Sequence, residues 1–443
     1  MRNTIECTRK NKMFELKPDK NQQKILSKNG TELLSFHEAE PLWSCTLPWH
    51  FSGRVLALNN LQRLSTQLES ILLGLVEVYS KDYDCLRLAL DNSASRSLAP
   101  FLEHRFQDAK GQDFAEHRLR EDCPLAPILM EPCFRHGDMT PWGGEKLKTL
   151  FHKNIPDSLT GESLEISAIP GLESQDAAGV PLSEFIEKYG ACLLGDDFSD
   201  APFPLLLKLL DAKALLSIQV HPDDAYAAAH ENGKRGKEEA WVVLDCEPDA
   251  KLVYGLKPGT SKEELAACLH AGASPEHLVS FAHVKKGDIF YIPPGTVHAL
   301  GSGIVVYEIQ QSSDVTYRMW DWSRVDSAGR ARALHIEDSL CNIQFGQYPA
   351  VSQLPTTAGK HRLIDARHFI LCAVNVTKQE RLEHDGSSFL LLTALSPLCL
   401  EAFDQKLSLR SGQSLLIPAS LKQFSLTGQG CALVVKPKGA YKG

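Results

Sequence analysis

The chain has 443 residues, of which 43% are hydrophobic and 23% charged, with a formal net charge of -8. This is the composition of a globular protein with room for several domains, and its acidic balance argues against nucleic-acid binding. No apolar run reaches the roughly 18 residues of a transmembrane helix. The N-terminus lacks the apolar core of a secretory signal, and the 12 cysteines form no C-x-x-C pair. We therefore expect reduced cysteines, a cytoplasmic location and no membrane partner.

Residues 1–124 are predicted to form a helical extension. In "NNLQRLSTQLESILLGLVEVY" (59–79), apolar residues recur every three or four positions, which is typical of an amphipathic helix, and Asn60 is a plausible N-cap. A similar pattern runs through residues 98–121. The segment contains no catalytic set of residues. Its apolar face can pack within the chain or support self-association, and the sequence leaves both open.

From about residue 125 the chain becomes rich in predicted strands punctuated by Gly and Pro. This pattern favours sandwiches or barrels of short strands. The runs are 240–246, 251–256, 288–295, 303–311, 369–376, 388–395, 413–419 and 431–437. One helix is predicted in "PDDAYAAAHENG", with Pro222 as its first residue and Gly233 just past its end.

Two segments of this part resemble each other. "KKGDIFYIPPGTVH" (285–298) aligns without gaps on "RSGQSLLIPASLKQ" (410–423), and each predicts a turn, a strand and a Pro that ends the pairing. The repeat indicates two related β-domains in tandem. In this alignment Gln423 stands where the first copy carries His298, so a metal ligand at His298 has no counterpart in the second copy.

The stretch "LLSIQVHPDD" (215–224) suggests a pocket wall. Successive side chains of a strand point to opposite faces, so Ser217, Gln219 and His221 share one face and Ile218 and Val220 the other. An amide and an imidazole on one face, followed by Pro222, are unusual for a purely structural strand.

Further along the chain, Glu239 and His298 complete a possible ligand set with Gln219 and His221. Two imidazole nitrogens and two oxygens suit a four-coordinate zinc with room for water. The same donors also accept iron, manganese or nickel. On spacing alone, the alternative is that both histidines are satisfied by local hydrogen bonds.

Several motifs in order resemble the type I mannose-6-phosphate isomerases, a family with the cupin fold. They are "PWGGEKLKTLF", "SIQVHPDD", "GKEEAW", "GDIFYIPPGTVHALG" and "EIQQSSDVTYRMWDW". The resemblance is strong over residues 126–345 and fainter beyond. It implies a mainly β protein with two tandem cupin (jelly-roll) domains: a catalytic domain at 125–345 with the metal site, and a metal-free domain at 346–443.

The resemblance also implies one Zn²⁺ per chain, bound by Gln219, His221, Glu239 and His298. Glu239 rather than Glu238 is the expected ligand, because the family pattern Gly-Lys-x-Glu falls on Gly236, Lys237 and Glu239. The strand period agrees, since Glu238 points away from that face.

The implied reaction interconverts mannose 6-phosphate and fructose 6-phosphate by proton transfer between C1 and C2. Lys237 and Glu308 are rival proton-transfer residues, and Arg318 is the expected partner of the enediolate or phosphate. The expected substrate contacts are Ser217, Asp314 and Trp142. Asp314 and Arg318 have an alternative reading as an ion pair that fixes a loop.

Two other functions use similar ligands. A cupin dioxygenase with iron or manganese would consume oxygen, and a sugar-phosphate sensor would bind without turnover. The chain also departs from the family in two ways. It carries the extension 1–124, and it has Glu238 where the family often has Thr.

Overall fold

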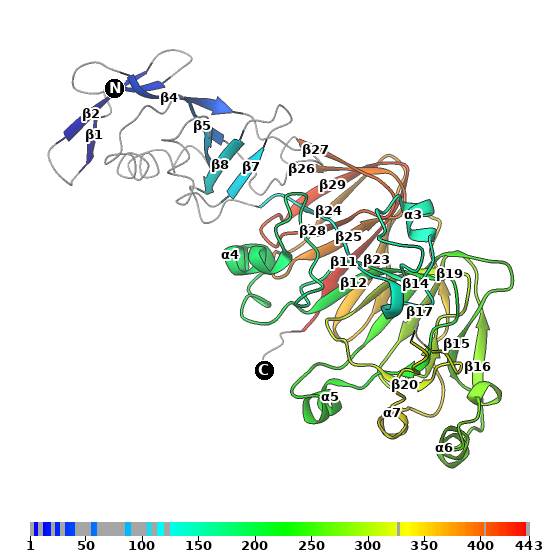
Figure 1. The fold of residues 1–443 in the computed structure, drawn as a ribbon. Coiled ribbons are helices and arrows are strands. Elements are labelled where there is room, and N and C mark those ends of the chain that lie inside the picture. The colour runs from blue at the N-terminus through cyan, green and yellow to red at the C-terminus, as the bar shows by residue number, and fades with distance from the viewer. Residues whose placement is uncertain are drawn as a thin grey trace.

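The computed structural model describes residues 125–325, 328–402 and 405–439, and eight strands within residues 1–124. These strands form one sheet in the order β1-β2-β3-β4-β5-β6-β8-β7 (Figure 1). Their bounds are β1 (Thr4–Cys7), β2 (Lys12–Pro18), β3 (Gln23–Leu26), β4 (Glu32–Ala39), β5 (Val55–Asn59), β6 (Cys85–Ala89), β7 (His104–Gln107) and β8 (Asp113–Arg118).

The prediction of a helical extension is wrong for these strands. β7 and β8 pair antiparallel within the segment 98–121, where helix was expected. Gly111, between the two strands in sequence, is a turn-forming residue whose signal the helical reading overlooked. The helix predicted at 59–79 lies almost entirely outside the described residues.

Residues 125–439 build two pairs of antiparallel sheets (Figure 1), so the prediction of a mainly β protein is confirmed. The larger sheet of the first pair has the order β10-β11-β12-β19-β14-β17-β21, and the smaller has the order β16-β15-β18-β13-β20. Their bounds are β10 (Cys133–Arg135), β11 (Glu162–Ile166), β12 (Leu205–Ala212), β13 (Ile218–Val220), β14 (Glu239–Cys246), β15 (Lys251–Leu256), β16 (Val279–His283), β17 (Asp288–Ile292), β18 (His298–Ala299), β19 (Ile304–Gln311), β20 (Tyr317–Trp320) and β21 (Ser352–Gln353).

The second pair of sheets has the orders β22-β23-β30-β25-β28-β9 and β24-β29-β26-β27. Its strands are β9 (Ile128–Met130), β22 (Gly359–Asp365), β23 (Phe369–Val376), β24 (Gln379–Glu383), β25 (Leu390–Ala394), β26 (Leu398–Ala402), β27 (Gln405–Leu409), β28 (Ser414–Ile417), β29 (Gln423–Gly428) and β30 (Gly430–Pro437). All eight strand-like runs of the sequence therefore coincide with strands. β9 comes before the first pair in sequence but pairs within the second.

Short helices connect and flank the sheets. They are η2 (Gly137–Met139), α3 (Lys146–Phe151), α4 (Leu182–Leu194), α5 (Asp224–His230), α6 (Lys262–His270), η3 (Pro275–His277) and α7 (Ile336–Asn342). Asp223 caps α5, its carboxylate accepting from the Tyr226 N–H, so Pro222 precedes the N-cap rather than starting the helix as expected. In the described part of the chain, no helix is long and apolar enough to cross a membrane.

The two pairs of sheets share one strand connectivity. Strands β11 to β19 pair as 11-12-19-14-17 and 16-15-18-13, and strands β22 to β30 pair as 22-23-30-25-28 and 27-26-29-24. The two segments that resemble each other in sequence contain β17 and β28, at corresponding places. Gly287 and Gly412 precede these strands with φ of +88° and +81°, as tight turns require.

The two large sheets pack against each other through one apolar core. Leu207 and Leu209 of β12 lie in the same buried cluster as Leu371 and Leu433 of the second pair. The opposite face of β12 carries Lys208 and looks into the first pair. Because β12 is buried on both faces, its sequence is a nearly continuous apolar run rather than an alternation.

Beyond β17 and β28, the strand pairing of the two copies differs by one residue from the gapless sequence alignment of the repeat. His298 is fully buried on β18 and stands opposite Gln219, whereas Gln423 is exposed. In the second pair the buried residues at this place are Phe424 and its partner Leu382. The second copy therefore lacks the ligand, as predicted, but Phe424 rather than Gln423 replaces His298.

Candidate active site

Strand β13 brings the first two candidate ligands to one wall, as the alternation predicts. Gln219 pairs with His298 on β18 and with Arg318 on β20. Ile218 and Val220 point the other way and are buried in an apolar cluster. His221 follows the end of the strand. Burial of Ile218 and Val220 on one face thus holds Gln219 and His221 on the other face.

His221, Glu239 and His298 form a buried cluster. One ligand atom from each lies within 4.8 Å of the others. Nε2 of His298 is 3.1 Å from Oε1 of Glu239, and Nε2 of His221 is 3.7 Å from Oε2. Their exposed fractions are 1%, 0% and 0%. Three donors from three strands or strand ends converge where little water reaches them.

Backbone carbonyls orient both imidazoles. Nδ1 of His221 lies 3.0 Å from the Val315 carbonyl oxygen, and Nδ1 of His298 lies 2.8 Å from that of Thr296. These contacts assign the proton of each neutral ring to Nδ1. The lone pair of each Nε2 then faces the cluster, which is the arrangement that metal-binding histidines adopt.

Gln219 completes the set that the sequence predicted. Its amide nitrogen lies 3.2 Å from Nε2 of His298. An amide turned by 180° presents its oxygen at the same place, and the two orientations are assigned from hydrogen bonds rather than observed. The side chain therefore offers an oxygen ligand beside His298.

The electrostatics of the cluster fit a bound cation. Burial alone would raise the pKa of Glu239, but the charge of Lys237 holds it well below its usual range. Burial and the charge of Lys237 lower the pKa of His221, so its ring is neutral. Among the described residues, no group donates a well-aligned hydrogen bond to either Glu239 oxygen. Two imidazoles and two oxygens fit the donor set of zinc.

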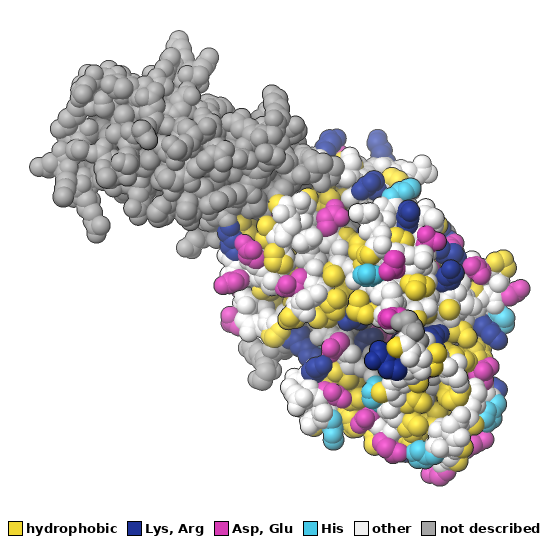
Figure 2. Space-filling model, viewed as in Figure 1, with side chains coloured by type: hydrophobic (Ala, Val, Ile, Leu, Met, Phe, Trp, Pro, Cys, Tyr) yellow, Lys and Arg dark blue, Asp and Glu magenta, His cyan; other side chains and the backbone are white. Residues whose placement is uncertain are grey.

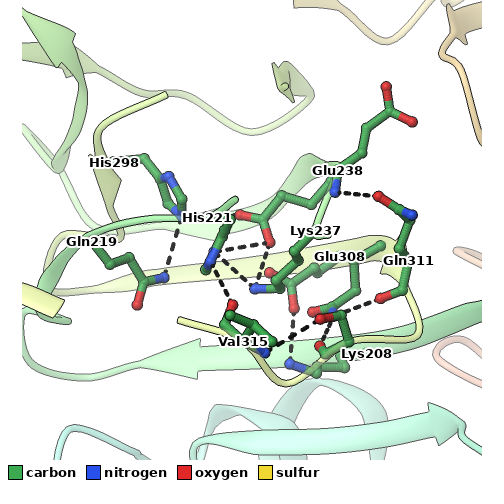
Figure 3. A network of polar contacts seen from close by, with 12 residues as sticks. Lys208, Gln219, His221, Lys237, Glu238, His298, Glu308, Gln311 and Val315 are labelled. Carbon is green, nitrogen blue, oxygen red and sulfur yellow. Dashed lines mark hydrogen bonds and ion pairs between the residues drawn. The ribbon is translucent and has the colours of Figure 1, made fainter. Parts of the chain in front are cut away.

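Lys237 lies directly beside the ligands (Figure 3). Its Nζ is 2.7 Å from Oε2 of Glu239 and 3.0 Å from Nε2 of His221. The side chain is buried, with 6% exposed, and lines the neighbouring cavity. The structure thus brings the predicted lysine to the point where the cluster meets the cavity.

A cavity of about 270 Å³ opens beside the cluster. All the predicted catalytic and substrate-contacting residues line it, together with one ligand: Trp142, Ser217, Gln219, Lys237, Glu308, Asp314 and Arg318. The residues singled out from the sequence therefore lie around one cavity, although most of them are far apart in the chain.

Asp314 and Arg318 do not form the ion pair considered from the sequence. Asp314 binds Lys234 at 2.8 Å, and both side chains are half-exposed. Nη1 of Arg318 donates to the Ala333 carbonyl at 3.0 Å. Burial lowers the pKa of Arg318, with the charge of Arg332 acting in the same direction. Arg318 therefore faces the cavity without a carboxylate partner among the described residues.

The sequence reading missed a chain of buried charges on the cavity floor. Lys208 lies 3.1 Å from Glu308 and 3.4 Å from Glu162, which also contacts Arg135 at 3.3 Å. The indole N–H of Trp241 donates to Glu308 at 2.8 Å. The carboxylates raise the pKa of Lys208 despite its burial. A single lysine within the apolar run "LLLKLLDA" was the available signal, because a lone buried charge needs partners.

Glu238 points away from the cluster, as the strand period predicts. Its carboxylate binds the hydroxyl of Tyr291 and the imidazole and backbone N–H of His368. His368 lies between β22 and β23, in the second pair of sheets. Glu238 therefore connects the ligand-bearing segment to that pair, and it is no metal ligand.

Comparisons with known proteins match this part of the chain. A family model described as the catalytic domain of type I phosphomannose isomerase matches residues 136–240, a range that includes three of the four candidate ligands. Mannose-6-phosphate isomerase of Streptococcus mutans is 36% identical over 313 residues, covering 68% of this chain and 96% of that protein. Mannose-6-phosphate isomerase ManA of Bacillus subtilis is 35% identical over 320 residues, covering 70% and 98%.

Solved structures agree. The mannose 6-phosphate isomerase of Bacillus subtilis is similar with a TM-score of 0.60 and 31% identity, covering 70% of this chain and 99% of that one. A variant of phosphomannose isomerase from Salmonella typhimurium has a TM-score of 0.58 at 18% identity, covering 70% and 100%, and shares the fold.

Proposed function

Because the chain belongs to the type I phosphomannose isomerase family, we propose that it interconverts mannose 6-phosphate and fructose 6-phosphate. The observation that carries this proposal is the buried cluster of His221, Glu239 and His298 beside a polar cavity. We infer that these residues and Gln219 hold one Zn²⁺ per chain, since zinc favours such donors. When bound, the ion would act as a Lewis acid toward the sugar oxygens.

The reaction moves a proton between C1 and C2 of the sugar through an enediolate, and it needs a base that the substrate can reach. Lys237 and Glu308 both line the cavity and are both buried. Lys237 contacts two ligands, whereas Glu308 is held by Lys208 and Trp241 on the floor. We propose that these two residues handle the proton, because a positioned acid or base gains efficiency where water is excluded.

Arg318 is proposed to bind the negative charge of the substrate. Its guanidinium stays ionised and can contact two oxygens at once. Ser217 lines the same wall and offers a hydroxyl, and the ring of Trp142 closes the cavity. Asp314, held by Lys234, is proposed to contact sugar hydroxyls at the rim.

The architecture is proposed to be two tandem cupin domains, catalytic at 125–345 and metal-free at 346–443. The shared strand connectivity of the two pairs of sheets supports this division. Strand β9 crosses this division, because residues 128–130 fall within the range of the first domain but pair with β28 of the second. The eight described cysteines are free thiols, which supports the cytoplasmic location. Self-association through residues 1–124 rests on a helical face outside the described residues.

The test is to incubate the metal-loaded protein with mannose 6-phosphate and to measure fructose 6-phosphate and dissolved oxygen together. The isomerase produces fructose 6-phosphate without oxygen uptake. Oxygen consumption identifies the dioxygenase alternative, and binding without product identifies the sensor. Either of these results contradicts the proposed function.

A further inference from the structure

The second pair of sheets contains a cavity of its own, of about 430 Å³. It is lined by residues from β22, β23, β24, β25 and β30 and from the turn after β24. These strands correspond, in the shared connectivity, to β11, β12, β13, β14 and β19, which line the candidate active site. The two cavities therefore occupy the same place in the two copies of the fold.

Three of the four positions that carry candidate metal ligands in the first pair of sheets are apolar in the second, and the position of His221 corresponds to His384. The pair Gln219 and His298 corresponds to Leu382 and Phe424, which face each other across β24 and β29. Glu239 pairs with Ile292, and its counterpart Leu390 pairs with Ile417, each isoleucine preceding a proline. Of the four candidate ligands, only His221 thus has a counterpart of its own kind, His384, and Leu382, Leu390 and Phe424 stand in place of the other three donors.

The charged residues on the floor of the second cavity also differ from those on the floor of the first. Strand pairing matches Lys208 and Glu308, which stand opposite each other, with Cys372 and Val434. On the edge strand β22, Lys360 and Arg362 line the cavity where β11 of the first copy contributes Glu162. The two carboxylates of the first floor therefore have no counterpart on this floor, and two cations have been gained. Glu383 and Asp385 also line the cavity, and each is paired with a cation, Arg381 and Lys436 respectively.

The cations of this cavity are accessible to a ligand. Lys360 is exposed and forms no ion pair among the described residues, and Arg362 is held only by Asp365, with both side chains open to solvent. Lys436 contacts Asp385 at 3.1 Å. Surface pairs of this kind exchange at little cost. Lys360 and Arg362 lie two apart on one strand and so share a face, where together they suit an anionic group.

His384 adds a directed polar contact. Its Nε2 lies 2.7 Å from the Leu421 carbonyl oxygen, which assigns the proton to that nitrogen. Its Nδ1 is buried and has no hydrogen bond among the described residues, although the residue lines the cavity. The free lone pair can accept a hydrogen bond from a hydroxyl or amine of a ligand.

We propose that the second cavity binds a small organic anion with an apolar body, its charge held by Lys360 and Arg362. Leu382, Leu390 and Val434 supply the apolar surface. The site is distinct from the proposed isomerase centre, and its occupancy is measurable without turnover.

The probe is 1-anilinonaphthalene-8-sulfonate, an apolar anion whose fluorescence rises in apolar surroundings. It is titrated into the full-length, metal-loaded protein and into the variant Lys360→Glu/Arg362→Glu. The matched control is Lys378→Glu/Arg410→Glu, which reverses two exposed cations of the same pair of sheets that do not line the cavity. Lys208→Met tests whether the probe sits in the first cavity instead. Benzoate and phenyl phosphate are added as competitors to distinguish carboxylate from phosphate recognition.

We expect saturable binding of one probe molecule per chain, at least tenfold weaker in Lys360→Glu/Arg362→Glu and within twofold of wild type in the control and in Lys208→Met. Isomerase turnover, measured on the same samples, should not change in the Lys360→Glu/Arg362→Glu variant. Equal binding by this variant and wild type, or loss of binding only in Lys208→Met, would overturn the proposal. A protein that binds the probe as expected but lacks turnover would contradict only the isomerase function.

Discussion

Glu238 and His368 form a buried ion pair that joins the ligand-bearing segment to the second pair of sheets. Nδ1 of His368 lies 2.7 Å from Oε2 of Glu238, and its Nε2 lies 3.0 Å from Oδ2 of Asp224. Gln311 binds both acidic residues, accepting from the Glu238 N–H and donating to Asp224. Glu238 thus holds a histidine that the second pair of sheets supplies.

This pair makes folding stability depend on pH. Burial opposes the charge of His368, but its hydrogen bonds to Asp224 and Glu238 prevail and raise its pKa to about 9. A pKa raised above the unfolded value of 6.5 gives stability that is complete below pH 6.5 and is lost as pH rises through 9. At pH 6.5, His368→Gln should lower the free energy of unfolding by about 3 kcal/mol, since it leaves two carboxylates without their cation.

Urea unfolding of wild type and His368→Gln at pH 6.5 and pH 10 measures this effect. The difference between the two proteins should shrink at pH 10, where wild-type His368 is neutral. The half-buried His361→Gln, whose ring contacts the Thr357 carbonyl rather than a carboxylate, serves as the control and should change stability little at either pH. A difference that is the same at both pH values would show that the charge of His368 does not contribute.

Removing a metal ligand should lower bound metal and turnover together. We expect Gln219→Ala and His298→Ala each to lose at least tenfold in metal affinity, because each removes one of the four proposed metal donors. Gln423→Ala is the matched control. It removes the exposed residue that the sequence alignment placed opposite His298, and it should leave metal content unchanged. Metal analysis after dialysis, alongside activity, checks the prediction. Full metal content in either ligand variant would exclude that residue from the set.

Glu308→Gln should reduce kcat by a factor on the order of 10² to 10⁴, the range for a positioned acid or base. The amide keeps the shape of the side chain and its contact with Trp241, so bound metal should be retained. Steady-state kinetics and metal analysis on the same sample decide the matter. If kcat is unchanged, Glu308 is only the structural partner of Lys208.

Lys237→Met separates the second proton-transfer candidate from the first. The methionine side chain is of similar length to lysine, but it cannot donate or accept a proton. We expect a loss in kcat of the same order, and loss of the exchange of the substrate's C2 hydrogen with solvent deuterium. Lys257→Met, at an exposed lysine that does not line the cavity, is the control and should keep kcat. Exchange at the wild-type rate in Lys237→Met would assign the proton transfer to Glu308 alone.

Deleting residues 1–124 should leave turnover within a few-fold of the full chain. Every residue of the candidate site lies between Arg135 and Arg332, and their described contacts fall within residues 125–439. Leu125, at the start of the remaining chain, is itself buried and bonded to Ser420. Kinetics and light scattering on the shortened protein test this. A soluble, metal-loaded but inactive product would contradict it.

Strand alternation predicted one wall of the candidate site, and the resemblance to the family supplied its other residues. Ser217, Gln219 and His221 share a face, and Glu239 rather than Glu238 points toward the two histidines, both as expected. Lys208 and Glu162, the partners of Glu308, escaped notice because these residues meet only through strand pairing between β11, β12 and β19. The ion pair considered for Asp314 named Arg318 rather than Lys234. Lys234 lies on a separate loop, and spacing along the chain cannot show that this loop approaches Asp314.

The helix prediction for the N-terminal region failed because the same pattern of apolar residues is compatible with a helix and with a pair of strands. The stretch "HRFQDAKGQDFAEHR" contains apolar residues at helical spacing, yet residues 106 and 114 are register partners in the antiparallel pair β7 and β8. A short amphipathic segment fits either period, and pairing with a neighbouring strand decides between them. The one-residue shift that places Phe424 opposite Leu382 likewise depends on strand register.

The most direct test of the account is a metal titration of the chelator-treated protein. Zn²⁺ is added stepwise, and bound metal and fructose 6-phosphate formed from mannose 6-phosphate are measured in each sample. We expect no turnover without metal, a rise in proportion to bound Zn²⁺, and a plateau at one ion per chain that Glu239→Gln does not reach. Full turnover by the metal-free protein, or saturation with metal without any isomerisation, would contradict the central claim.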